Sequence, residues 1–166
     1  YLADRVVPML PRTLSNGICS LNAGEDRLAL SCIMTIDGKG RIIGHTIAET
    51  VICVNRRLSY TGVQKALDDD PEETALYPEL VPMLKEMAEV SALLRKRRRK
   101  RGSIDFDFPE TKVILDEKGY PIDIRPYERN TATRLIEDFM LAANETVAED
   151  YFWQEVPFLY RTHDEP

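Results

Sequence analysis

The chain has 166 residues, of which 28 are acidic and 22 are basic, and its formal net charge is −6. This length suits one domain with a substantial hydrophobic core, and the acidic balance argues against nonspecific binding to nucleic acid. No apolar run approaches the roughly 18 residues of a membrane span and nothing resembles a signal peptide, so we expect no membrane association.

The first residues already read as ordered structure, although the chain begins at Tyr1 without a methionine. This beginning indicates an excerpt from a longer protein. Residues 8–22, PMLPRTLSNGICSLN, contain two prolines and a glycine, so they should run as loop and short turns.

A β-hairpin is the first regular element that the sequence predicts. Residues 27–36, RLALSCIMTI, alternate apolar and other residues as a strand does, and residues 37–40, DGKG, have the composition of a hairpin turn. Residues 41–54 form the returning strand. Its end, TVICV, is apolar on both faces, so we place it near the centre of a sheet.

Two of the three cysteines, Cys32 and Cys53, fall in these strands. An odd count without a C-x-x-C pair argues against a disulfide framework and against structural zinc. We therefore expect Cys32 and Cys53 to be small buried side chains in a protein of the reducing cytoplasm.

A short helix should follow the hairpin, because Ser59 is a suitable N-cap and Val63 and Leu67 share one helical face. It should end before Pro71, which cannot continue a helix. The aspartates 68–70 are interpreted as a solvated acidic loop, since consecutive carboxylates lack the spacing of metal ligands.

Residues 79–101 predict a long helix that ends in seven consecutive cations, Arg95 to Arg101. Subtracting these seven from the 22 basic residues leaves 15 against 28 acidic ones, so the positive charge is concentrated here. Cations complement the dipole at a helix C-terminus, and a solvated helix end is one interpretation of the run. A phosphate-contacting patch is the other, because seven cations exceed what capping requires.

A second hairpin is predicted where residues 111–115 and 120–124 flank the turn DEKG. Before it, residues 103–108, SIDFDF, alternate apolar and acidic side chains. Together these elements predict a mixed α/β (α+β) fold, in which a largely antiparallel, twisted sheet of hairpins packs with several helices.

The last predicted helix, residues 134–152, carries a continuous apolar face, and Asn130 or Thr131 is a plausible N-cap. Two adjacent carboxylates, Glu137 and Asp138, stand in this otherwise apolar segment. In the structural interpretation Asp138 pairs with Arg134 one turn back and Glu137 lies in solvent. In the functional interpretation Glu137 belongs to a binding site.

Seven motifs occur in an order that points to a family. They are PMLPRTLSNGICSLN, DRLALSC, RLSYTGV, RGSIDF, TKVILDEKGYPIDI, RLIEDFMLAANETVAE and PFLYRTHDEP. Together they resemble the RNB catalytic domain of the ribonuclease II/ribonuclease R exoribonucleases, the ribonuclease R side more closely, over essentially all of residues 1–166.

The resemblance implies an enzyme that hydrolyses single-stranded RNA processively from the 3′ end and releases 5′-nucleoside monophosphates. It also implies a two-metal Mg²⁺ site, in which one ion generates the attacking hydroxide and the other stabilises the leaving oxygen. The metal-binding aspartate cluster of the family is absent from this chain, as is its downstream arginine segment. None of Asp68 to Asp70, Asp105 and Asp107 matches that cluster, so we expect a partial domain over residues 1–166 that is inactive by itself.

Four positions of the chain match RNA-contacting residues of the family. Tyr1 and Tyr60 match aromatic residues near the terminal nucleotides, Glu137 matches the acidic companion of Tyr60, and Phe106 matches a phenylalanine that stacks on the last base. Aromatic faces stack on any base, and a carboxylate that accepts a hydrogen bond from a ribose 2′-hydroxyl distinguishes RNA from DNA.

Arg97 and Arg101, in the basic run, are added as candidate RNA contacts. We expect no catalytic and no metal-binding residue in the chain itself. The alternative function is a catalytically inactive RNB-like protein that binds RNA or regulates another protein. The sequence upstream of Tyr1, with or without the aspartate cluster, separates the two.

Overall fold

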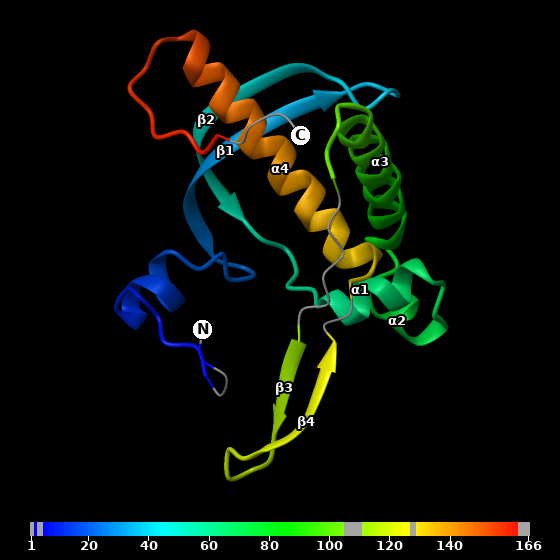
Figure 1. Cartoon of the computed structure of the whole chain (residues 1–166). Coiled ribbons are helices and arrows are strands. Elements are labelled where there is room, and N and C mark those ends of the chain that lie inside the picture. The colour runs from blue at the N-terminus through cyan, green and yellow to red at the C-terminus, as the bar shows by residue number, and fades with distance from the viewer. Residues whose placement is uncertain (1, 3–4, 105–110, 127–128, 163–166) are drawn as a thin grey trace. The chain divides into compact units, whose positions relative to one another are not determined.

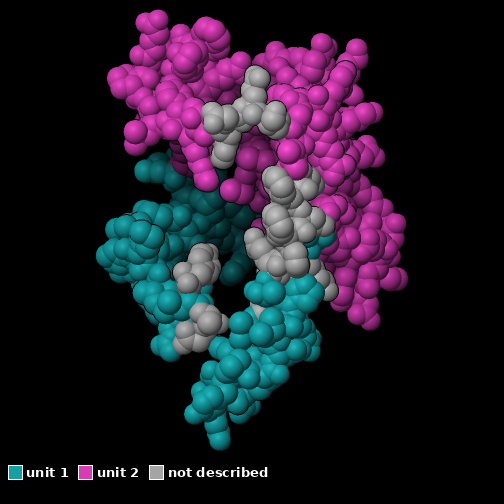
Figure 2. Space-filling model, viewed as in Figure 1, with its two compact units in different colours: residues 1–28, 51–57, 106–129 teal, residues 29–50, 58–105, 130–166 magenta. Residues whose placement is uncertain are grey.

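The structure, a computed structural model, describes residues 2, 5–104, 111–126 and 129–162. The chain divides into two compact units (Figure 2): unit 1 comprises residues 1–28, 51–57 and 106–129, and unit 2 comprises residues 29–50, 58–105 and 130–166. The elements, shown in Figure 1, are the π-helix η1 (Thr13–Ile18), strands β1 (Asp26–Ile36) and β2 (Ile42–Cys53), helices α1 (Tyr60–Leu67), α2 (Pro71–Leu76) and α3 (Val81–Lys100), strands β3 (Thr111–Leu115) and β4 (Pro121–Pro126), and helix α4 (Thr131–Trp153). This composition confirms the predicted mixed α+β class.

Strands β1 and β2 form the predicted hairpin, whose turn is closed by the amide of Asp37 donating to the Arg41 carbonyl (2.9 Å). The described residues add no further strand to this sheet, which has two strands only. The prediction that the end of β2 lies near the centre of a sheet is therefore wrong, and Val51 is 64% exposed. The prediction of a buried thiol is also wrong for Cys53, which is exposed, because each strand of a two-stranded ribbon is an edge.

The hairpin turn contains a carboxylate that holds it closed. The Asp37 side chain accepts hydrogen bonds from the amides of Lys39 and Arg41 (both 2.9 Å) and from Nε of Arg41 (2.7 Å). The backbone hydrogen bond from Arg41, followed by its side-chain hydrogen bond, lowers the pKa of Asp37 from 3.8 to about 2. These bonds favour the ionised form because an ionised carboxylate is the better acceptor.

We expect the stability of the hairpin to depend on pH through Asp37. Because its pKa is lower in the folded chain than the ordinary value of 3.8, the stabilisation is complete above about pH 4 and is lost as the pH falls toward 2. Unfolding curves over this range should show a weaker pH dependence for Asp37→Asn. Arg41→Met keeps the backbone donor, so its pH dependence should lie between those of the unaltered chain and Asp37→Asn. If the pH dependence of Asp37→Asn equals that of the unaltered chain, Asp37 is not its source.

Helices α1 and α2 both begin at side-chain caps. Ser59 accepts from the amide of Gly62 (3.1 Å) and starts α1 as predicted. Asp70 accepts from the amides of the second and third residues of α2 (3.0 and 3.1 Å), and Pro71 is its first residue. The predicted acidic loop, residues 68–70, is thus followed directly by a short helix that was not predicted, because Asp, Pro and two glutamates satisfy the requirements of a helix N-terminus.

The core of unit 2 begins where α1, α2 and α3 meet. Its buried side chains are Ala66, Tyr77, Val81 and Leu84. Helix α3 starts two residues after the predicted position 79 and ends one residue before the predicted position 101. In Figure 1 it runs beside α4, with which it makes the most extensive helix–helix packing of the described residues.

Helix α4 begins at a reciprocal cap that confirms Asn130. Its side chain accepts from the amide of Thr133, while the Thr133 hydroxyl accepts from the amide of Asn130 (both 3.0 Å). This capping box fixes the first turn and therefore the direction in which later side chains of the helix point. Across unit 2, the Thr146 hydroxyl of α4 donates to Sδ of Met34 on β1 (3.4 Å).

The second hairpin, β3–β4, belongs to unit 1. Its strands are antiparallel, with Val113 opposite Ile124, and a register shift between Ile114 and Leu115. The predicted strand 111–115 is confirmed, and the returning strand begins one residue later than predicted. Among all the helices described, none has the length and apolar character needed to cross a membrane.

Candidate nucleic-acid interface

Two of the predicted RNA-contacting residues lie on packed helices of unit 2. Tyr60 is the first residue of α1 and is 47% exposed, and Glu137 lies on α4 with 39% of its side chain exposed. Helix α1 is joined to the start of α4 by the amide of Ala132, which donates to Oε1 of Gln64 (3.2 Å). Gln64 stands one turn after Tyr60, so this contact lies on the same side of α1 as the tyrosine. The other two positions that match the family, Tyr1 and Phe106, lie outside the described residues.

Asp138, next to Glu137, is the most deeply buried polar side chain of unit 2, with 0% of its side chain exposed. Its Oδ2 accepts hydrogen bonds from Oγ of Ser91 (2.6 Å) and from Nη2 of Arg95 (2.5 Å). Its Oδ1 lies 3.0 Å from Nη1 of Arg98. All three partners come from α3.

The proposed pairing of Asp138 with Arg134 is wrong, since the described residues contain no ion pair between them and Nε of Arg134 is buried without a hydrogen-bond partner. A carboxylate and a cation one turn apart on a helix gain little when a neighbouring helix offers two guanidinium groups in a buried site. Asp138 therefore turns toward α3.

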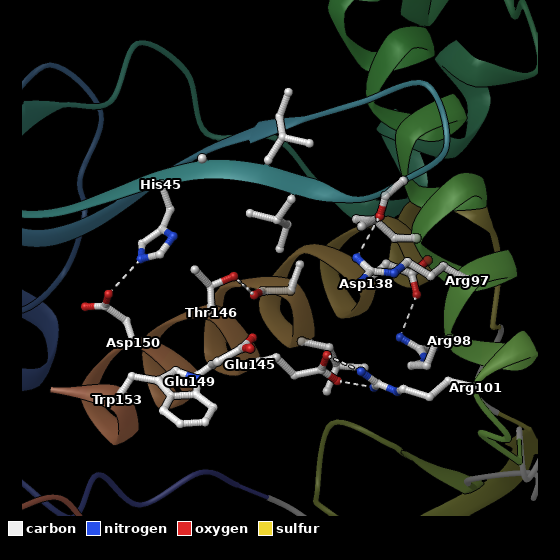
Figure 3. A pocket seen from close by; sticks show the side chains of 17 residues that line it. His45, Arg97, Arg98, Arg101, Asp138, Glu145, Thr146, Glu149, Asp150 and Trp153 are labelled. Atoms are coloured by element: carbon white, nitrogen blue, oxygen red, sulfur yellow. Dashed lines mark hydrogen bonds and ion pairs between the residues drawn. The ribbon is translucent and has the colours of Figure 1, made fainter. Parts of the chain in front are cut away.

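Arg98 lies against both of the adjacent carboxylates, Glu137 and Asp138. Besides its contact with Asp138, its Nη2 lies 3.6 Å from Oε1 of Glu137, and only 16% of its side chain is exposed. Figure 3 shows Arg98 pointing from α3 toward Asp138. Glu137 is thus partly exposed and lies next to a cation of α3.

The two candidate phosphate contacts, Arg97 and Arg101, also have partners inside unit 2. Arg101 binds both oxygens of Glu145 through its two terminal nitrogens (2.7 and 2.9 Å), an arrangement visible in Figure 3. The hydrogen bond to Glu145 raises the pKa of the Arg101 guanidinium. Arg97 donates from Nη1 to the carbonyl of Gly40 (3.3 Å) in the hairpin turn.

The basic run is therefore not simply a solvated helix end. Lys96, Arg97, Arg99, Lys100 and Arg101 are nevertheless exposed, and a phosphate-contacting role for the run stays a prediction. At least Arg95, Arg98 and Arg101 pair with carboxylates of α4, while Lys96 is exposed. Sequence reasoning missed this role. The sequence did contain a signal of this pairing. Arg95, Arg98 and Arg101 are three residues apart and so share one face of α3, while Asp138 and Glu145 are seven residues apart and so share one face of α4.

A cavity of about 410 Å³ lies next to this interface, between β2, α3 and α4. It is bounded at one end by the arginines of α3 and at the other by His45, whose Nε2 is 2.9 Å from Oδ1 of Asp150. Figure 3 shows the ring of Trp153 beside this end of the cavity. Its walls carry both signs of charge, with three arginines of α3 and four carboxylates of α4.

No metal site is found in the part of the chain that the structure describes, since no three side chains of His, Cys, Asp or Glu are grouped as ligands. The described residues do not fit the Mg²⁺ ions that the sequence resemblance implies. Two of the aspartates 68–70 have structural roles. Asp70 caps α2, and Asp69 accepts a hydrogen bond from Nζ of Lys85 (2.5 Å).

Comparisons with known proteins agree with the fold. The family model described as RNB domain matches residues 1–166. Ribonuclease R 1 of Lactococcus lactis is 45% identical over 166 residues, covering 100% of this chain and 20% of that protein. Ribonuclease R of Thermotoga maritima is 46% identical over 167 residues, covering 100% and 23%. The chain spans about a fifth to a quarter of the length of the curated relatives it matches.

Solved structures give the same result. Mycoplasma genitalium RNase R in complex with ribose methylated single-stranded RNA matches with a TM-score of 0.87 and 35% identity, covering 98% of this chain and 25% of that one. The same protein in complex with double-stranded RNA matches with a TM-score of 0.85 and 34% identity, covering 95% and 28%.

Proposed function

Because this chain belongs to the RNB domain family, we propose that it forms a central segment of the catalytic domain of a ribonuclease R-type exoribonuclease. The whole protein hydrolyses single-stranded RNA processively from the 3′ end and releases 5′-nucleoside monophosphates. Its Mg²⁺ ions are held by residues outside residues 1–166, so the segment alone does not turn over RNA. The segment instead supplies side chains that grip the RNA.

The observation that carries this proposal is the arrangement of Tyr60 and Glu137 on two packed helices of one unit, each partly exposed. An exposed aromatic ring stacks on a base of any identity and contributes about 1–3 kcal/mol. A carboxylate accepts a hydrogen bond from a ribose 2′-hydroxyl, which DNA lacks. The two residues together give contact with any RNA sequence and discrimination against DNA.

The remaining RNA contacts of the proposal are Tyr1 and Phe106, as stacking residues, and Arg97 and Arg101, as phosphate contacts. Arg101 keeps a contact with Glu145 and Arg97 one with the Gly40 carbonyl, so each would contact phosphate with its remaining donors. A guanidinium has five N–H donors, and these contacts use at most two of them.

The test compares Tyr60→Ala and Glu137→Ala in the protein with its natural flanking sequence. Glu137→Ala should reduce the ratio of kcat/KM for an RNA strand to that for the matched DNA strand. Tyr60→Ala should lower kcat/KM on both strands, because stacking on a base does not depend on the sugar. For Glu137→Ala we expect roughly a tenfold reduction, because a hydrogen bond to a charged group contributes about 1.5–3 kcal/mol. Nucleotide release is measured on both strands at several substrate concentrations.

Tyr120→Ala and Glu86→Ala are matched controls, because each removes an exposed side chain of the same type elsewhere in the chain. An unchanged RNA-to-DNA ratio in Glu137→Ala would remove Glu137 from the site, and an unchanged kcat/KM on both strands in Tyr60→Ala would remove Tyr60. Failure of the unaltered protein to release nucleotides in Mg²⁺, with RNA binding retained, would favour the inactive RNA-binding relative instead.

A further inference from the structure

Arg98 connects the proposed RNA-contacting carboxylate to the inside of unit 2. One terminal nitrogen of its guanidinium lies 3.0 Å from Asp138 and the other lies 3.6 Å from Glu137. Glu137 and Asp138 are consecutive, so their side chains leave the helix about 100° apart. The planar guanidinium of Arg98 has donors on two sides and can contact both carboxylates at once. The position of Glu137 is thereby tied to that of Asp138.

Asp138 is a rigid anchor for this connection. No part of its side chain is exposed, and Ser91 and Arg95 hold its other oxygen at 2.6 and 2.5 Å. If Arg98 swung away, a buried carboxylate would lose one of its two cationic partners, which is strongly unfavourable. Only 16% of the Arg98 side chain is exposed, so neighbouring atoms also restrict its movement.

The contact with Glu137 is looser than a hydrogen bond and acts mainly through charge. At 3.6 Å the guanidinium attracts the carboxylate and limits its rotation. An ionised carboxylate has about four acceptor positions, so the contact with Arg98 does not by itself exhaust this capacity. A carboxylate held in this way loses less conformational entropy when a ribose hydroxyl binds it.

We infer that Arg98 is a positioning residue for RNA selectivity: it orients the Glu137 carboxylate toward the ribose 2′-hydroxyl without touching the RNA itself. The inference rests on the proposed function of Glu137. It assigns to one member of the basic run a role distinct from phosphate binding.

The first test changes Arg98 to Lys in the protein with its natural flanking sequence. Lysine keeps a positive charge beside Asp138, so the fold is retained, but a single ammonium cannot bridge both carboxylates as the guanidinium does. The ratio of kcat/KM on RNA to that on matched DNA should fall by roughly fivefold to tenfold. Lys96→Met, which removes an exposed cation of the same helix, should leave the ratio unchanged.

The second test repeats Arg98→Lys in a Glu137→Ala background. If Arg98 acts through Glu137, the two effects on the ratio are not additive, and Arg98→Lys has no further effect there. An equal fall in both backgrounds overturns the inference, because Arg98 would then act without Glu137. A selectivity unaltered by Arg98→Lys overturns it as well.

A third variant, Glu137→Gln, leaves Asp138 and both arginines in place. The amide oxygen still accepts a hydrogen bond but is no longer attracted by charge to Arg98, so the ratio should again fall several-fold. Full selectivity in Glu137→Gln contradicts charge-based positioning. If Glu137→Ala itself leaves the ratio unchanged, the proposed role of Glu137 fails. That result does not depend on any Arg98 variant, so the two failures can be told apart.

Discussion

Replacing Asp138 with alanine is expected to lower the free energy of unfolding by about 3–5 kcal/mol, because the change leaves Arg95 and Arg98 in a largely buried site without their carboxylate. Ser91 also loses the acceptor of its hydroxyl. The cost is large because two largely buried guanidinium groups then lose the negative charge that compensates them. Urea unfolding followed by circular dichroism measures the change.

Two controls separate a buried charge from an ordinary ion pair. Glu137→Ala removes the neighbouring, partly exposed carboxylate and should cost only about 0–1 kcal/mol. Replacing Asp138, Arg95 and Arg98 together with apolar residues of similar size should recover much of the loss, because no uncompensated charge remains. A loss below 1 kcal/mol in Asp138→Ala would show that this cluster is not a structural centre of unit 2.

Gly40→Ala is the second substitution with a large expected effect. Gly40 has a φ of +72°, and a Cβ placed there would lie 2.9 Å from the carbonyl oxygen of Leu93 in α3. The left-handed conformation alone costs a non-glycine residue about 1–2 kcal/mol. The contact with helix backbone cannot be relieved by rotating a side chain, so we expect a total loss of about 3 kcal/mol.

Gly119→Ala is the matched control for this prediction. Gly119 occupies the other hairpin turn with a φ of +84°, but a Cβ there meets no atom within 4 Å. The difference between the two variants therefore measures how closely the β1–β2 turn packs on α3. Equal losses in the two variants would contradict this close packing.

The elements were predictable where the signals are local. Ser59 and Asn130 are both caps in the structure, because a short polar side chain before an apolar helical face satisfies the first free amides. The turn at residues 37–40 followed from the placement of its glycines. Helix α2 carried equally local signals in Asp70 and Pro71 and could have been predicted from them.

The errors concern features that depend on distant residues. The partners of Asp138 lie 40 or more positions earlier in the chain, and the spacing of the arginines marks a shared face of α3 without showing which helix that face meets. Val51 and Cys53 were predicted to be buried because their segment is apolar, yet burial requires a neighbouring element that the described chain does not place over them. The roles of Tyr60 and Glu137 came from family motifs, since neither composition nor periodicity marks them.

The pairing of the basic run with α4 changes how strongly salt should affect the protein. A lysine or arginine that replaces small cations around RNA releases them to solution, and this release makes binding sensitive to ionic strength. In the folded chain at least three of the seven cations already have carboxylate neighbours and displace fewer ions. A free peptide of residues 95–101 should therefore respond to added salt more steeply than the same residues do in place.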